Sequence, residues 1–275
     1  MKVFVIDLSV CNGCYCCQIA CKDEHVGNDW MPYARPQPDT GQFWIGLAEK
    51  VRGHVPQVRV SYVPNLCHHC DDAPCMEECK AEAIYKRDDG MVIIDPEKCI
   101  GCKLCADTCP HNAIFFNDQL NLAQKCTGCS HLRDSDPEEW TEPRCVDQCP
   151  TEAIRFGEES DFADFIAEAE PYRTEAGTKS RVYYKGLPKK FIAGTLYEPN
   201  DKEVIIGASC TLTDEESGEV FTETTNNFGD FWLENLKDNR SFTLTLEKDG
   251  YSRTITGLTT DIDRGLGDIP MDMKG

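Results

Sequence analysis

Apolar and polar positions alternate over short distances in the last third of the chain. Six segments after residue 190 show this pattern, among them FIAGTLY (191–197), VIIGASCTLT (204–213) and SFTLTLEK (241–248). Turn-forming pairs such as Ser217-Gly218 and Asp249-Gly250 separate these segments. Short alternating segments at this spacing predict the strands of a small β-sandwich or barrel. We therefore place an all-β domain at residues 191–275.

The preceding part of the chain repeats a shorter pattern, Cys-x-x-x-Ala-Ile. It ends at Ile84, Ile114 and Ile154. Such a repeat indicates one supersecondary unit used several times, here a loop, a short helix and a short strand that starts at each isoleucine. GMVIID (90–95) predicts a further strand, and apolar residues at helical spacing predict a helix within residues 158–170. Mixed short helices and strands make the fold class α+β.

A proline-rich stretch separates the first two groups of cysteines. Residues 22–66 contain five prolines, and we expect an irregular insertion that ends in a strand over 58–63. The predicted first domain then covers residues 1–188, with this insertion and a tail over 158–188. The boundary between the two domains falls near Pro188-Lys189-Lys190.

Charge and hydropathy narrow the class of protein. The net charge is −20, shared about equally between the parts before and after residue 190, so binding to nucleic acid is not expected. We find no run of 18 apolar residues and expect no membrane span. Residues 1–10 are too short and too acidic for the apolar part of a signal peptide. We therefore expect a cytoplasmic protein.

The cysteines carry the chemistry. Of eighteen, only Cys210 lies beyond Cys149, and clusters of this kind in a chain without secretion signals favour metal ligands over disulfides. Sixteen form four groups. Group one is Cys11, Cys14, Cys17 and Cys21; group two is Cys67, Cys70, Cys75 and Cys79; group three is Cys99, Cys102, Cys105 and Cys109; group four is Cys126, Cys129, Cys145 and Cys149.

The spacing within the groups indicates cubane iron–sulfur clusters. Groups one and three read C-x-x-C-x-x-C-x-x-x-C, in which three cysteines hold one 4Fe-4S cluster and the fourth reaches another. The groups must therefore work in pairs. Zinc is the alternative, but zinc sites use two separated C-x-x-C pairs for one ion, which does not suit three cysteines in one tight run. Sixteen ligands predict four clusters, or three if one site stays empty.

The four groups, together with YVPNLCHHCDDAPC (62–75) and RVYYKGLP (181–188), resemble the iron–sulfur subunits of molybdopterin enzymes of the DMSO reductase family. The resemblance implies two ferredoxin-like modules, in which group one pairs with group four and group two with group three. It thereby implies four ligand sets. Site 1 is Cys11, Cys14, Cys17 and Cys149; site 2 is Cys126, Cys129, Cys145 and Cys21; site 3 is Cys67, Cys70, Cys75 and Cys109; site 4 is Cys99, Cys102, Cys105 and Cys79.

The same resemblance implies an electron-transfer subunit in a heterodimer with a large catalytic chain that carries molybdenum in bis(molybdopterin guanine dinucleotide). Two other interpretations remain open. The chain could be a structural subunit whose clusters hold a docking surface, or a free polyferredoxin. GASCTL (207–212), TTNNFGDFWLENL (224–236) and FTLTLEKDGY (242–251) resemble carboxypeptidase-regulatory-like or prealbumin-like β domains. No nucleophile triad, phosphate loop or carboxylate pair stands out, so we expect no active site on this chain.

Five residues outside the sixteen ligands, and one loop, call for an interpretation of their own. Lys80 stands where the family usually has proline, and we expect it to point to solvent rather than to tune a cluster. His68 and His69 are expected to pack or to hydrogen-bond cluster sulfur rather than to ligate iron. Cys16 is surplus to group one, and Cys210 is expected to be a small buried apolar residue. The acidic loop 130–144 is expected to be a solvated loop or a docking element.

Overall fold

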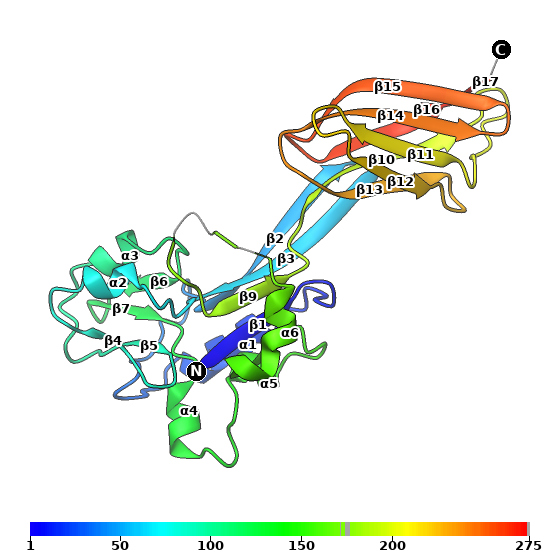
Figure 1. Cartoon of the computed structure of the whole chain (residues 1–275). Coiled ribbons are helices and arrows are strands. Elements are labelled where there is room, and N and C mark those ends of the chain that lie inside the picture. Colours follow the sequence, from blue (N-terminus) through cyan, green and yellow to red (C-terminus); the bar gives the residue numbers. More distant parts are fainter. Residues whose placement is uncertain (171, 174–176, 274–275) are drawn as a thin grey trace. The chain divides into compact units, whose positions relative to one another are not determined.

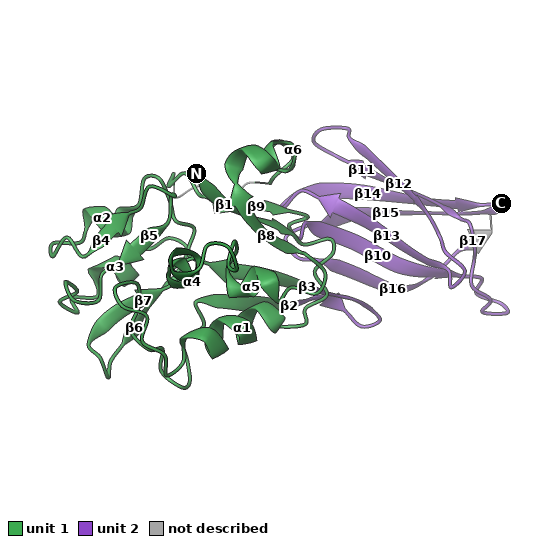
Figure 2. Cartoon of the chain, turned by 90° about the horizontal axis from the view of Figure 1, so that it is seen from below, with its two compact units in different colours: residues 1–49, 62–187 green, residues 50–61, 188–275 purple. Residues whose placement is uncertain are grey.

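The computed structural model describes residues 1–170, 172–173 and 177–273. They form two compact units, coloured separately in Figure 2. Unit 1 comprises residues 1–49 and 62–187, and unit 2 comprises residues 50–61 and 188–275. Each unit is built around its own buried apolar residues. Among the described residues, no helix combines the length and the apolar character that crossing a bilayer requires.

A three-stranded sheet lies at the centre of unit 1. Strand β1 (Lys2–Asp7) pairs antiparallel with β8 (Ile154–Glu158) and parallel with β9 (Val182–Lys185). The four inner residues of β1 are fully buried, and an uninterrupted apolar run of this kind is typical of a strand covered on both faces. The sheet therefore joins the start of the chain to two segments about 150 or more residues away.

The predicted repeat is present three times in unit 1. Its one-turn helices are α2 (Pro74–Glu77), α3 (Leu104–Asp107) and α5 (Arg144–Asp147). The strands β4 (Ile84–Lys86), β6 (Ile114–Asn117) and β8 begin at the three expected isoleucines, which confirms the repeat. Strands β5 (Val92–Ile94) and β7 (Leu122–Lys125) complete two antiparallel hairpins with β4 and β6.

The turn within the repeat has the same conformation each time. Glu82, Asn112 and Glu152 are left-handed, with φ of 49°, 50° and 53°. Each donates its backbone N–H to the carbonyl of the last cysteine of its group, over 2.9–3.1 Å. A left-handed residue that is not glycine is uncommon, so its recurrence shows that the surrounding structure requires this turn. The turn reverses the chain from each cysteine loop into the following strand.

The remaining helices of unit 1 are α1 (Cys16–His25), α4 (Ser130–Ser135) and α6 (Ala163–Ala167). The 3-10 turn η1 (Glu159–Phe162) leads into α6, and the two together occupy most of the helix predicted within residues 158–170. Helix α1 itself supplies two of the expected ligands, because Cys17 and Cys21 are on its buried face.

Within residues 22–66, the strand expected over 58–63 is confirmed, but the segment before it is not irregular as predicted. Strands β2 (Ile45–His54) and β3 (Gln57–Leu66) pair with each other and are ten residues long each. Most of their side chains are exposed or half-buried, and β2 lacks the alternation of apolar residues that would have indicated it. Backbone pairing holds such a hairpin without a continuous apolar face.

Unit 2 consists of two sheets (Figure 1). The alternation of apolar and polar residues after residue 190 had predicted an all-β region. One sheet has the order β13 (Asp230–Leu236), β10 (Lys190–Tyr197), β16 (Arg264–Pro270). The other contains β12 (Val220–Thr224), β11 (Ser209–Asp214), β14 (Ser241–Lys248), β15 (Tyr251–Thr259) and β17 (Asp272–Met273). Buried residues from both sheets form one core. Strand β16, rich in glycine, was not expected from the sequence.

The tip of the β2–β3 hairpin belongs to unit 2, which the sequence analysis did not anticipate. Arg52 donates to both carboxylate oxygens of Asp263 over 2.9 and 2.7 Å, and Gln57 bonds the Thr195 hydroxyl over 3.1 Å. A Cβ on Gly53 would lie 2.4 Å from the Gln57 carbonyl oxygen and 2.8 Å from the Phe191 ring, so only glycine fits there. Residues 50–61 are thus integral to the packing of this unit.

Candidate metal centre

The cysteine loops owe their shape to left-handed residues at fixed places. In groups one and three, Gly13 and Gly101 share a φ of 71°, and Tyr15 and Lys103 have φ of 62° and 65°. A Cβ on Gly101 would lie 2.5 Å from the Asn121 carbonyl oxygen, so glycine is required there. Alternating left- and right-handed residues curl a loop and direct successive N–H groups into one concavity, an arrangement that favours anionic groups such as thiolate-ligated clusters.

Site 3 surrounds a cavity. The cavity is lined by all four cysteines that the family resemblance assigned to this site, Cys67, Cys70, Cys75 and Cys109. Three of them come from group two, and Cys109 comes from the end of group three, shortly after α3. The structure therefore brings together ligands from two groups, as crossed ligation requires.

The other three sites also gather their expected members. The thiols that affect the pKa of Cys17 are those of site 1, and those that affect Cys105 are those of site 4. Among the neighbouring thiols that raise the pKa of Cys145, the three other cysteines of site 2 have the largest effect. Within the described residues, no group of three or more His, Cys, Asp or Glu side chains is arranged to hold a single metal ion.

Burial raises the pKa of several thiols in these sites. Burial, followed by the neighbouring thiols of site 3, raises the pKa of Cys75 to about 12. Burial likewise raises the pKa of Cys129, in site 2, to about 12. Thiolates are the soft ligands that iron–sulfur clusters use, so loading must displace protons from these groups. Four converging thiolates repel one another, and the positive charge of a bound metal core would compensate this repulsion.

The sites differ in burial. All four cysteines of site 2 and three of site 3 are buried, whereas sites 1 and 4 each include one exposed cysteine, Cys14 and Cys102. Cys126 of site 2 interacts with Cys67 of site 3, and the buried Cys145 interacts with Cys17 of site 1. One apolar cluster contains cysteines of both site 3 and site 4. The sites are therefore linked in the order 1, 2, 3, 4, with accessible ends and a buried middle.

Two histidines line the site 3 cavity with unused nitrogen atoms. His68 Nδ1 lies 2.8 Å from the Ser180 hydroxyl, and His69 Nδ1 accepts a bond of 3.0 Å from the Val92 amide. Both Nε2 atoms are buried and have no hydrogen-bond partner among the described residues. Burial is the main cause that lowers the pKa of each imidazole, for His68 to about 2, so both rings are neutral.

The tautomer of His69 follows from its partner. Since Nδ1 accepts a hydrogen bond, the single proton of the neutral ring is on Nε2. A buried N–H without a partner is rare and costs free energy, and a cluster sulfur in the adjoining cavity would accept it. The residues present therefore fit a 4Fe-4S cluster at site 3. The expectation that these histidines bond to sulfur rather than to iron stays a prediction.

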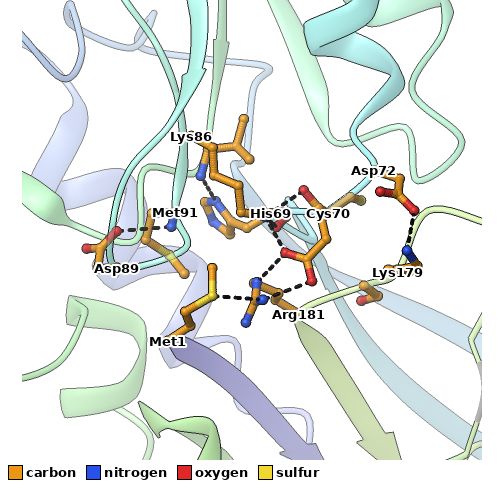
Figure 3. A network of polar contacts seen from close by, with 12 residues as sticks. Met1, His69, Cys70, Asp72, Lys86, Asp89, Met91, Lys179 and Arg181 are labelled. Atoms are coloured by element: carbon orange, nitrogen blue, oxygen red, sulfur yellow. Dashed lines mark hydrogen bonds and ion pairs between the residues drawn. The ribbon is translucent and has the colours of Figure 1, made fainter.

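A network of charges braces the loop that follows Cys70 (Figure 3). Asp71 receives a bond of 2.5 Å from Lys86 and a two-pronged contact of 2.7 and 2.8 Å from Arg181. Partial burial opposes the effect, but these hydrogen bonds hold the pKa of Asp71 below its usual value. Lys86 also donates to the carbonyls of His69 and Cys70, over 3.2 and 2.9 Å. The network keeps the second ligand of site 3 in position.

The other residues singled out from the sequence take different places. Lys80 is exposed, as expected, and Cys210 is fully buried in unit 2. Cys16 is half-buried at the start of α1, beside Cys14. The acidic loop is partly helical, and its Asp134 accepts two bonds of 2.9 Å from Arg87. Lys86, Lys125 and Arg181 were missed, because a lysine or arginine that will be buried looks in the sequence like one on the surface.

Comparison with known proteins agrees with this geometry. Residues 58–159 match the family described as 4Fe-4S dicluster domain. The pyrogallol hydroxytransferase small subunit of Pelobacter acidigallici is 37% identical over 97% of this chain and 98% of its own length. A putative dimethyl sulfoxide reductase iron–sulfur subunit of Halobacterium salinarum is 33% identical over 66% of this chain and 77% of its own.

A third relative shows the same kind of match. A sulfite dehydrogenase subunit of Allochromatium vinosum is 35% identical over 68% of this chain and 82% of its own length. Relatives of this identity and coverage share a family with the chain. The chain belongs to the iron–sulfur subunits of the DMSO reductase family of molybdenum enzymes.

Proposed function

We propose that this chain carries electrons through a row of four 4Fe-4S clusters to or from a molybdenum-containing catalytic chain. The observation that carries the proposal is the row of cysteine sites in the order 1, 2, 3, 4. When bound, such clusters accept and release single electrons. Their placement in a row suits this role, because the rate of electron tunnelling falls steeply with distance. Transfer over a long distance therefore needs intermediate redox centres.

The gradation of burial supports the same role. Sites 2 and 3 are enclosed, while Cys14 at site 1 and Cys102 at site 4 are exposed. Enclosed clusters are protected from solvent and exchange electrons with their neighbours in the row. Accessible end sites can approach the cofactor of another chain. We propose that the end sites are the points of entry and exit.

The likeness to the pyrogallol hydroxytransferase small subunit supports a finer proposal. The match runs over 97% of this chain, so it includes most of unit 2 as well as the cysteine-rich part. We propose a heterodimer in which the large partner carries molybdenum in bis(molybdopterin guanine dinucleotide) and transfers hydroxyl groups between phenols. Catalysis then belongs to the partner, and this chain has no active site of its own. We place the complex in the cytoplasm, whose reducing conditions suit the loading of clusters on thiols.

The structural reading remains the second candidate, because one observation favours it. Cysteines of sites 2 and 3 are part of the apolar clusters of unit 1, so metal binding there would also hold the fold together. Structural metal sites contribute roughly 10 kcal/mol or more to folding. Hydroxyl transfer between phenols also involves no net gain or loss of electrons. Under this reading the clusters are present but do not change oxidation state during turnover.

Purification from the native source with gel filtration tests the proposal. We expect a large chain that contains molybdenum to co-elute, together with iron and sulfide. A lone species near 30.9 kDa would support a free polyferredoxin instead, and zinc without sulfide would exclude clusters altogether. Rapid mixing of the complex with the partner's substrate separates the two remaining readings. Reduction of the clusters within one turnover supports electron transfer, and clusters that stay unchanged favour the structural role.

A further inference from the structure

A buried lysine lies between the two enclosed sites. Lys125 ends strand β7, immediately before Cys126 of site 2, and only 2% of its surface is exposed. Its Nζ donates to the carbonyl of Val92 and, over 3.0 Å, to that of Cys126. Val92 lines the cavity of site 3. The ammonium group therefore adjoins site 2 through one carbonyl and site 3 through the other.

The charge of Lys125 reaches the thiols of both sites. Burial raises the pKa of Cys126 in site 2 to about 11, and Lys125 is among the charges that oppose this rise. In site 3, the rise caused by burial is likewise opposed by Lys125 for Cys75 and Cys109. One cation thus favours the anionic form of ligands in two separate sites.

Such a cation is costly to bury unless negative charge compensates it. A lone ammonium loses several kcal/mol of hydration when it is taken out of water. Among the ion pairs between described residues, none includes Lys125, so no carboxylate there accounts for its burial. Two carbonyl oxygens supply part of the compensation. A 4Fe-4S cluster with four thiolate ligands is an anion and would supply the rest.

We infer that Lys125 raises the reduction potentials of the clusters at sites 2 and 3 and so keeps both enclosed sites able to accept electrons. The inference rests on the proposed cluster-binding function. Reduction adds one electron to a cluster and makes or breaks no bond. The added negative charge is stabilised by a fixed positive charge nearby, and low dielectric strengthens the effect.

The chain provides a natural comparison. Lys80 also adjoins a ligand, Cys79 of site 4, but it is exposed. Water and salt screen an exposed charge, so its effect on a nearby cluster is small. Both lysines are next to a cysteine in the sequence. Burial is therefore the reason that Lys125 affects the reduction potentials of clusters and Lys80 does not.

Redox titration of the cluster-loaded full-length chain, as it purifies with its partner, tests the inference. The variants are Lys125→Gln and Lys125→Met, which remove the charge, and Lys125→Arg, which keeps it. Electron paramagnetic resonance and visible absorbance follow each couple, and iron and sulfide analysis reports loading. We expect two couples of each neutral variant to lose at least about tenfold in their reduction equilibrium constant, a shift of about 59 mV to lower potential.

The controls define what overturns the inference. The remaining couples should not move, and Lys125→Arg and Lys80→Met should each change every couple by less than about threefold. Fully loaded neutral variants with unchanged potentials would disprove the role of Lys125. Loss of clusters from both neutral variants would show Lys125 to be a structural residue and would also overturn the inference. A wild-type chain without iron and sulfide would instead refute the proposed function.

Discussion

Removal of the Arg52 side chain should loosen unit 2 far more than removal of Arg59, although both arginines lie on the same hairpin. Arg52 and Asp263 are only 10% and 9% exposed, and they form two hydrogen bonds of 2.9 and 2.7 Å. Arg52 also donates to the Lys189 carbonyl, and Asp263 accepts from the Phe191 amide over 3.3 Å. The variant Arg52→Met leaves the Asp263 carboxylate buried without its cation.

The magnitude follows from burial. Breaking one side of a buried pair costs about 3–5 kcal/mol. We expect about 3 kcal/mol, the lower end of that range, since about a tenth of each side chain still meets solvent. Arg59 pairs with Glu234 at 50% and 47% exposure and stacks 4.2 Å from the Trp232 ring. An exposed pair and an exposed cation–π contact together contribute about 1 kcal/mol.

Hydrogen exchange followed by mass spectrometry measures both effects in the full-length chain. Since about 1.4 kcal/mol is a factor of ten, amides of β10 and β16 should exchange about 100-fold faster in Arg52→Met and about fivefold faster in Arg59→Met. In a double variant with Asp263→Asn, the loss should be smaller than the sum of the single losses. Equal acceleration in the two arginine variants would refute the reasoning that burial decides the strength of the pair.

Two further predictions concern the ligands and the domain boundary. Replacing Cys109 by alanine should remove iron from site 3 and leave site 4 loaded, since Cys109 lines the cavity of site 3. Anomalous diffraction from iron shows which of the two sites is loaded. As a control, Cys210→Ala, in unit 2, should leave every site loaded. Residues 191–275 alone should melt at least about 12 °C below the same residues carrying the hairpin 45–66 on a flexible linker. Without the hairpin, about 3 kcal/mol from the Arg52–Asp263 pair is lost, and each kcal/mol lowers the melting temperature by about 4 °C or more. Circular dichroism at the melting transition checks this, and equal midpoints would contradict the assignment of the hairpin to unit 2.

Local features of this protein could be predicted from the sequence because their causes are local. The repeat Cys-x-x-x-Ala-Ile predicted where β4, β6 and β8 begin, since a few residues decide a tight turn and the strand after it. Alternation of apolar residues likewise predicted the strands that bury one face in the core of unit 2. Strand β2 escaped prediction because most of its side chains are not buried, whereas the strand expected over 58–63 is the inner part of β3.

Cysteine spacing by itself required that groups work in pairs, and it left the partner of each group open. The three-dimensional structure decided which distant thiols meet, as when Cys109 joins Cys67 at one cavity. It also decided that Lys125 is buried while Lys80 is exposed, although both adjoin a ligand in the sequence. The physical reason is that spacing sets the conformation of a loop, whereas burial and electrostatic surroundings depend on every element that packs against it.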